Sequence, residues 1–186
     1  MQQIHTPEKG CILAAEPFLG DPSFERTVIL LTEHNEEGTV GFVLNKPLEF
    51  KIDVLLPDFP ESDVTANYGG PVQQDNLYYL HTLGELLPGS IEVMEGLWWG
   101  GDLEVLKDLI RNEGIEPNSI RFFLGYSGWG PGQLEMEMDQ QSWVIFKGSP
   151  DWLFHKDGED IWKKLLLHLG GSYQIWANSP TDPILN

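Results

Sequence analysis

The sequence is poor in cysteine and in positive charge. Cys11 is the single cysteine among 186 residues, so no disulfide can form within the chain, and we interpret Cys11 as a small core residue. Lys and Arg number 11 against 29 Asp and Glu, which gives a formal net charge of -18 at pH 7. Proteins that bind nucleic acid directly rely on Lys and Arg to displace counterions from phosphates. Direct binding to nucleic acid or to an anionic membrane is therefore not expected.

The sequence also lacks long apolar runs and recognisable site motifs. Its apolar runs are far shorter than the roughly 18 residues of a membrane-spanning helix, and its start contains no apolar signal core. A cytoplasmic location is the simplest expectation. No zinc-ligand spacing, phosphate-binding Walker loop or local signature of a catalytic triad is present. We therefore predict no metal and no cofactor, although a site assembled only by folding would leave no such motif.

The sequence does contain enough apolar and aromatic residues for one folded domain. Hydrophobic residues make up 41% of the chain and aromatic residues 11%, and 186 residues suit a single core. We predict one domain over residues 1–186, with loose ends at about 1–8 and 179–186. The segments 27–33 and 39–44 should form an antiparallel hairpin. Because both are nearly continuous apolar runs, helices or a closed barrel should cover both faces of the sheet.

Apolar runs that alternate with turn residues predict the remaining elements. Further strands are expected at 10–15, 77–81, 91–99 with a break at 95–96, 120–124 and 143–146, and an edge strand at 173–177. Helices are expected at 52–56, 102–111, 133–138 and 161–169. The proline-rich stretch 57–63 is the most linker-like part of the chain, but it is too short to divide domains.

The stretch 121–135 has the densest signals of a special backbone. It predicts a strand, a turn built on four glycines, and a helix that begins near Pro131. The Gly-x-Ser-x-Gly pattern of a nucleophile elbow fails at Trp129, and the glycine spacing is wrong for a dinucleotide fingerprint. We interpret this turn as mainly architectural, with Tyr126, Ser127 and Trp129 as the side chains most able to face a ligand or a partner.

Two other glycine turns, at Gly69–Gly70 and Gly100–Gly101, and the ends of two strands supply further candidates. His81 ends an apolar strand where a side chain can point into a cleft, so it is the candidate acid or base, although a hydrogen-bonded structural histidine is the plainer interpretation. Asn45 could orient a substrate and Asp102 could stabilise charge. The candidate residues for binding a ligand or partner are Asn45, Gly69, Gly70, His81, Gly101, Asp102, Gly125, Tyr126, Ser127 and Trp129.

Five blocks of sequence, taken in order, form a characteristic set. They are 10–17 with Leu19 and Asp21-Pro22, the strand pair 27–45 with its Asn45-Lys46-Pro47 exit, 69–72 with Leu80-His81, 100–102, and 121–135 almost throughout. Together they resemble the AlgH/YqgE family of bacterial cytoplasmic proteins, over about residues 10–176. The sequence departs from the family pattern at Cys11, Ser127 and Trp98-Trp99, and the departure at Ser127 weakens the case for a shared nucleophile there.

The resemblance implies a compact α+β fold, in which helices pack around a twisted, largely antiparallel sheet that approaches a barrel. Members of the family carry the label of transcriptional regulators by association, and the resemblance implies no established biochemical activity. A shared fold does not specify chemistry. The function therefore has to be argued from the residues.

Two functions are open at this point. The first is a cytosolic binding or regulatory module that acts through an unidentified protein or small-molecule partner, with the three glycine turns lining one surface together with Trp98, Tyr126 and Trp129. The second is an enzyme that acts on a small molecule at a strand-end cleft, with His81 as acid or base and Asn45 as orienter. The acidic charge and the glycine turns favour the first. A wide separation of the polar candidates would exclude the second.

Overall fold

Within the residues that the structure describes, the β-branched and aromatic runs form ten strands, which join into one sheet. The structure is a computed structural model and describes residues 4–113, 115, 119–152, 154 and 160–180. The strands are β1 (Cys11–Ala15), β2 (Val28–Asn35), β3 (Gly38–Val43), β4 (Pro47–Lys51), β5 (Thr65–Tyr68), β6 (Val72–His81), β7 (Ile91–Met94), β8 (Leu97–Trp99), β9 (Ile120–Trp129) and β10 (Trp143–Lys147). The helices are α1 (Ile52–Leu55), α2 (Leu103–Glu113), α3 (Gln133–Asp139), α4 (Ile161–Leu169) and α5 (Tyr173–Ala177), with short 3-10 turns at Gly84–Leu86 and Pro150–Trp152.

The sheet is open and almost entirely antiparallel. Its strands follow the order β10-β1-β2-β3-β9-β6-β8-β7, with β5 also paired to β9 and β4 paired to β5. Only β5 and β9 run parallel among the described pairs. The predicted α+β class with a largely antiparallel sheet is confirmed. The sheet does not close into a barrel, because β10 and β7 end the order of the described strands without pairing to each other.

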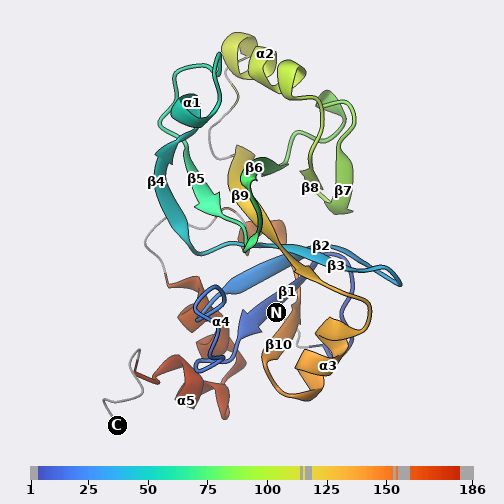
Figure 1. Cartoon of the computed structure of the whole chain (residues 1–186), viewed down its shortest axis with the longest axis vertical. Helices are drawn as coiled ribbons and strands as arrows, with labels where there is room; N and C mark the ends of the chain where they lie inside the picture. Colours follow the sequence, from blue (N-terminus) through green and yellow to red (C-terminus); the bar gives the residue numbers. More distant parts are fainter. Residues whose placement is uncertain (1–3, 114, 116–118, 153, 155–159, 181–186) are drawn as a thin grey trace.

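The long strand β9 connects two halves of the sheet (Figure 1). Its first half pairs with β6 on one side and with β5 on the other, whereas Ser127 to Trp129 pair with β3. In Figure 1 the half that contains β1, β2, β3 and β10 lies below, and the half that contains β4 to β8 lies above. The change of partner along β9 therefore lies where the two halves of the sheet meet.

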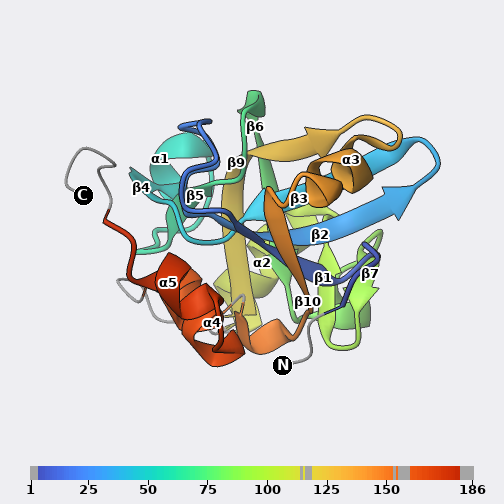
Figure 2. The same ribbon diagram turned by 90° about the horizontal axis from the view of Figure 1, so that it is seen from below.

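Helices cover both faces of the lower half of the sheet, as the apolar runs predicted. Alternate residues of β1 point to opposite faces. Ile12 and Ala14 belong to a core cluster with Trp162 of α4, whereas Leu13 belongs to a cluster with Leu134 of α3. Figure 2 shows α3 and α4 on opposite sides of β10. A third cluster lies in the upper half, beneath α1 and α2.

Two predicted elements differ from the structure. The glycine-rich stretch after residue 124 does not form a turn at once. Gly125 has a φ of 69° where the register against β6 shifts, and pairing with β6 and then β3 continues the strand as far as Trp129. Helix α3 therefore begins at Gln133, and Pro131 precedes it. The edge strand predicted at 173–177 is instead the short helix α5. Gly170 and Gly171 both have positive φ and turn the chain back so that α5 packs against α4.

The predicted loose ends fall partly outside the described residues. The backbone N–H of Ile4 donates to the carbonyl of Ile145 at 3.2 Å. The Arg26 guanidinium donates to the carbonyls of Ser179 and Pro180, both at 2.7 Å. The described part of each end is thus held against the domain. No helix within the described ranges is both long and apolar enough to cross a membrane.

Candidate functional site

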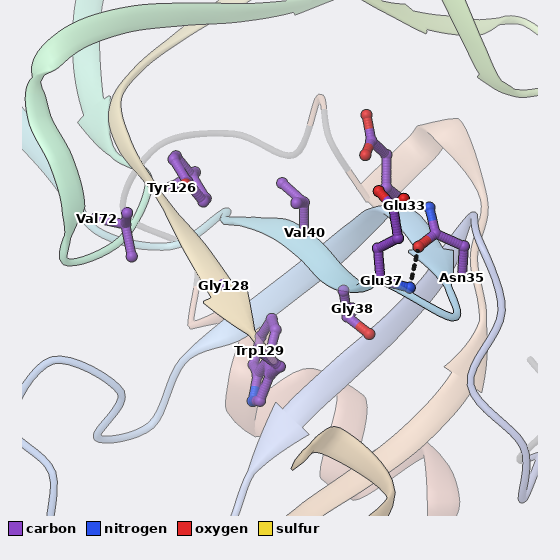
Figure 3. A pocket seen from close by; sticks show the side chains of 10 residues that line it. Glu33, Asn35, Glu37, Gly38, Val40, Val72, Tyr126, Gly128 and Trp129 are labelled. Carbon is purple, nitrogen blue, oxygen red and sulfur yellow. Dashed lines mark hydrogen bonds between the residues drawn. The ribbon is translucent and has the colours of Figure 1, made fainter. Parts of the chain in front are cut away.

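The predicted residues Tyr126 and Trp129 line a pocket of about 410 Å³ beside the β2–β3 hairpin, which we call the hairpin pocket. Its walls come from the end of β2, the hairpin turn, β3, and the parts of β6 and β9 that face them (Figure 3). The lining residues are Glu33, Asn35, Glu37, Gly38, Thr39, Val40, Val72, Tyr126, Gly128 and Trp129. The pocket therefore lies where β9 leaves β6 and joins β3.

The hairpin places two carboxylates at one side of this pocket. The register of β2 against β3 shifts just before Glu33. From there Glu33 and Asn35 lie on one face of the strand and His34 on the other, because side chains alternate along a strand. The Asn35 Oδ1 accepts the backbone N–H of Glu37 at 2.8 Å, and this bond fixes the hairpin tip (Figure 3).

Tyr126 and Val72 form the opposite side of the pocket. The Tyr126 ring meets the Tyr78 ring edge to face, with 5.8 Å between centroids. Gly128 follows two residues later on the same face of β9, and a Cβ there would lie 3.2 Å from the Tyr126 ring. Glycine at this position therefore leaves room for the ring to lie close to the strand. Val40 pairs with Gly128 and lies between the ring and the carboxylates (Figure 3).

The hairpin pocket has negative charge without a balancing cation in its lining. Glu33 and Glu37 are the charged residues among its lining residues, and neither takes part in an ion pair between described side chains. The nearest histidine, His34, lies on the other face of the strand, with its Nε2 3.5 Å from the carboxylate of Glu135 on α3. The pocket should therefore attract a cationic group and repel an anionic one.

Trp129 contributes little of its surface to the pocket. Its side chain is 5% exposed, and its indole N–H donates to the Glu137 carboxylate at 2.9 Å. The indole N–H of Trp143 donates to the same carboxylate oxygen at 2.8 Å. The Phe24 ring packs against both indoles. Trp129 thus belongs to the packing that attaches α3 to the sheet.

Two of the three predicted glycine turns meet beside the pocket. Gly69 and Gly70 cross β9 so closely that a Cβ at either would collide with the backbone at Gly125 or Tyr126. The carbonyl of Gly69 accepts the Ser127 hydroxyl at 3.1 Å. Ser127 is fully buried, so its hydroxyl holds this crossing and does not face a ligand, contrary to the expectation from sequence.

The third glycine turn lies with His81 at a different place, below the start of α2. His81 is fully buried. Its Nδ1 accepts the backbone N–H of Leu83 at 3.2 Å, so its Nε2 carries the proton and donates to the carbonyl of Gly100 at 3.0 Å. The Ser90 hydroxyl lies 3.0 Å from the same Nε2. His81 is a hydrogen-bonded core residue, and the idea that it points into a cleft is corrected.

The neighbouring residues Gly101 and Asp102 have structural partners. The carbonyl of Gly101 accepts the Tyr79 hydroxyl at 2.6 Å, and burial raises the pKa of Tyr79 to about 12. The Asp102 Oδ1 accepts the backbone N–H groups of Glu104 and Val105 at 2.9 and 3.2 Å, and so caps α2. Both residues define the start of a helix.

The polar group of Asn45 is occupied elsewhere. Its Oδ1 accepts the backbone N–H of Val28 at 2.9 Å, and its Nδ2 donates to the carbonyl of Arg26 at 2.8 Å. These bonds fix the start of β2 to the exit of β3. Asn45 and His81 share none of these hydrogen-bond partners, and neither lines the hairpin pocket.

The sequence did not indicate Glu33, Glu37, Val40 and Val72 as site residues. The polar link between β2 and β3 was interpreted only as a turn. The alternation of Glu33 and Asn35, which places both side chains on one face of the strand, was the signal that could have indicated the site. Two other pockets, of about 580 and 570 Å³, contain none of the predicted residues. The described residues contain no group of three or more His, Cys, Asp or Glu that could hold a metal ion.

Comparison with known proteins places the chain in a family. The model of the AlgH-like family matches residues 12–174. A UPF0301 protein of Chlorobaculum tepidum is 46% identical over 177 residues, which are 95% of each chain. A UPF0301 protein of Cytophaga hutchinsonii is 44% identical over 179 residues, which are 96% of this chain and 98% of that protein.

Solved structures agree with this assignment. The solution structure of the AlgH protein from Pseudomonas aeruginosa is similar with a TM-score of 0.74 and 30% identity, over 97% of this chain and 98% of that one. A crystal structure from Corynebacterium diphtheriae has the same TM-score, 0.74, at 20% identity, and shows a shared fold. With its sequence matched along almost its full length and its fold matched as well, the chain belongs to the AlgH-like family.

Proposed function

We propose that this chain is a cytoplasmic binding module with a regulatory role, which acts through a protein or small-molecule partner held in the hairpin pocket and not through direct contact with DNA. The observation that carries the proposal is the pocket itself. It joins an aromatic ring, two aliphatic side chains and two carboxylates in a concavity of about 410 Å³. Its volume lies in the range of ligand sites, roughly 300 to 1,000 Å³, and its polar lining residues Glu33, Asn35 and Glu37 favour a polar or charged ligand.

The exclusion of DNA is supported by the hydrogen bonds that Lys and Arg side chains make within the chain. At least seven of the 11 Lys and Arg residues donate to carbonyl or carboxylate oxygens of the chain itself. These are Lys9, Arg26, Lys46, Lys51, Lys107, Arg111 and Arg121. Cations held in this way release fewer counterions from a phosphate backbone. With 29 acidic residues around them, they offer little surface to nucleic acid.

The alternative of an enzyme at a strand-end cleft receives no support from the predicted acid or base. A general acid or base has to come within hydrogen-bond reach of its substrate. His81 is fully buried and has partners at both ring nitrogens. The arrangement of these residues therefore favours the binding function over the enzymatic one.

Filling the pocket tests the proposal. Val40→Trp should block the pocket, because Val40 lies between its two sides. The tagged protein is used to retain proteins and small molecules from a bacterial extract, and the retained molecules are identified by mass spectrometry. We expect molecules that wild type retains and Val40→Trp does not. The matched control is Val54→Trp, since Val54 is 76% exposed on α1 and outside the pocket, and it should behave as wild type.

Two outcomes would contradict the proposal. Equal retention by wild type and Val40→Trp, with both folded by circular dichroism, would remove the pocket from the function. A gel shift that shows tight binding of double-stranded DNA at about 0.15 M salt, where unspecific phosphate contacts are already weakened, would overturn the exclusion of DNA.

A further inference from the structure

We propose that the hairpin pocket binds a single lysine or arginine side chain presented by a protein partner. This inference rests on the proposed function and names the chemistry that the pocket recognises. It concerns the residues of the two opposed sides, Glu33 and Glu37 on the hairpin and Tyr126 on β9, together with Val40 between them.

The two sides of the pocket suit the two parts of a basic side chain. Lys and Arg have an aliphatic stem and a charged head, and the stem is commonly buried while the head stays polar. Val40 and Val72 offer apolar contact for a stem. The carboxylates of Glu33 and Glu37 offer oxygen acceptors for a head, and the ring of Tyr126 can face a cation. An anionic or purely apolar ligand would leave one of these sides unmatched.

The charges in the lining would be balanced by such a ligand. Glu33 is partly buried beside the pocket, whereas Glu37 lies at the exposed hairpin tip. No Lys or Arg side chain is among the lining residues, and neither glutamate has an ion pair with a described residue. His34 is directed to the other face, toward Glu135 and the Thr39 hydroxyl, where it lies 2.8 Å from the latter. A cation from outside the chain would therefore complete the pocket.

A protein is the better source of this cation than a free amine. The β2–β3 hairpin projects from the domain (Figure 1). Because residues of this hairpin line the pocket, a chain that passes along the hairpin could place one side chain into it. The net charge of -18 comes mostly from acidic residues other than the two glutamates of the pocket. Long-range attraction of this kind steers and orients a basic protein surface more strongly than a small monovalent amine.

The test uses two peptides that differ only in charge. One is an acetylated and amidated Gly-Ser peptide with a single central arginine, and the other has citrulline, the neutral isostere, at that position. Binding to the ¹⁵N-labelled full chain is followed by amide chemical shifts. We expect the arginine peptide to shift resonances of Val40, Tyr126 and Gly128, and to bind about ten-fold more tightly than the citrulline peptide. Its affinity should fall as salt is added.

Variants identify the groups responsible. The double variant Glu33→Gln and Glu37→Gln should lower the affinity for the arginine peptide about ten-fold, and Tyr126→Leu should lower it about three-fold. Glu36→Gln is the matched control, because Glu36 lies in the same hairpin but outside the pocket lining. A single neutralisation there should change the affinity less than two-fold. The amide spectrum of each variant shows whether it is folded.

Several results would overturn the inference. Equal binding of the arginine and citrulline peptides would exclude recognition of charge, and an effect of Glu36→Gln as large as that of the double variant would indicate only a general acidic field. Binding of spermidine without binding of the arginine peptide would identify a free polyamine in place of a protein. If no peptide binds while Val40→Trp still loses retained molecules, the proposed function survives and this inference fails.

Discussion

His81 is enclosed by protein, and both of its ring nitrogens have hydrogen-bond partners. Burial is the larger influence and lowers its pKa, and the bond to the carbonyl of Gly100 opposes this only in part. Protonation would place a second N–H at Nδ1, opposite the N–H of Leu83 that it now accepts. The folded chain therefore favours the neutral imidazole, which has a direct consequence for stability in acid.

We predict that the free energy of unfolding decreases as pH falls below about 6.5, the usual pKa of an unfolded histidine, because the unfolded chain then binds a proton that folded His81 does not. The contribution of His81 to the free energy of unfolding is fully present above that pH. It is lost as pH falls through the lowered pKa of folded His81. Its slope is at most about 1.4 kcal/mol per pH unit. Urea unfolding between about pH 7.5 and pH 5 measures it, above the range where most carboxylates titrate.

Two variants separate His81 from the other histidines. His81→Gln should be less stable but should have a flatter pH profile in this range. His5→Gln removes an exposed histidine outside this hydrogen-bond network and is the matched control, which should keep the profile of wild type. An unchanged profile in His81→Gln, or a flat profile in wild type, would show that His81 does not control the acid response.

At the scale of the element, the carboxylate of Glu137 links α3 to two tryptophans of the sheet. Glu137 Oε2 accepts both the Trp129 and the Trp143 indole N–H groups, and its Oε1 accepts the side-chain amide of Gln133 at 2.9 Å. Both indoles are 5% exposed, so they have little access to water as a replacement partner. Leu134 supplies the apolar contact of the same helix.

We predict that Glu137→Ala lowers the free energy of unfolding by about 2 to 4 kcal/mol, because two buried N–H donors lose their acceptor. Glu137→Gln keeps a carbonyl oxygen and should cost less. Glu135→Ala, on the exposed side of the same helix, should cost below about 1 kcal/mol. Urea unfolding followed by tryptophan fluorescence checks all three. Equal losses in Glu135→Ala and Glu137→Ala would show that this carboxylate has no special part in attaching α3.

The elements show where sequence patterns suffice. The apolar runs of β1, β2 and β3 predicted strands with two covered faces, and α3 and α4 cover them. The same reasoning failed for α5, because a short apolar segment fits either a helix or a strand until its neighbours are known. Sequence reasoning also predicted that β9 ends too early, because hydrogen bonds to β6 and β3 outweigh the turn preference of the glycines in β9.

At the scale of the whole molecule, acidic side chains far outnumber the basic side chains that could neutralise them. At least four ion pairs join described residues, one of which involves a histidine, while the chain has 29 Asp and Glu. Like charges confined to a folded domain repel each other more than in the expanded unfolded chain. Dissolved salt should therefore favour the folded state.

We predict that the melting temperature rises by about 2 to 4 °C when NaCl increases from about 0.01 M to about 0.15 M, since the Debye length falls from about 30 Å to about 8 Å. Differential scanning calorimetry at pH 7.5 measures the change. An equal osmolar concentration of a neutral solute serves as control and should give a smaller rise. A melting temperature that stays constant or falls with NaCl would mean that attractive charge pairs dominate this surface.

The candidate site was only partly predictable. Tyr126 and Trp129 were named because they lie in a glycine-rich stretch, and both line the hairpin pocket. Ser127 was named for the same reason, but its position in β9 turns it to Gly69 and the interior. Glu33 and Glu37 were missed, because only the pairing of β3 with β9 brings the hairpin opposite Tyr126.

The sequence by itself determined most of the strands and helices and the acidic character of this protein, because these follow from local periodicity and from composition. Its resemblance to the family indicated the α+β class. Only the tertiary structure decided that β9 continues through its glycines, that His81 is enclosed, and that two glutamates face a tyrosine across one pocket. These features depend on contacts between residues far apart in the chain, and such contacts leave no periodic trace in the sequence.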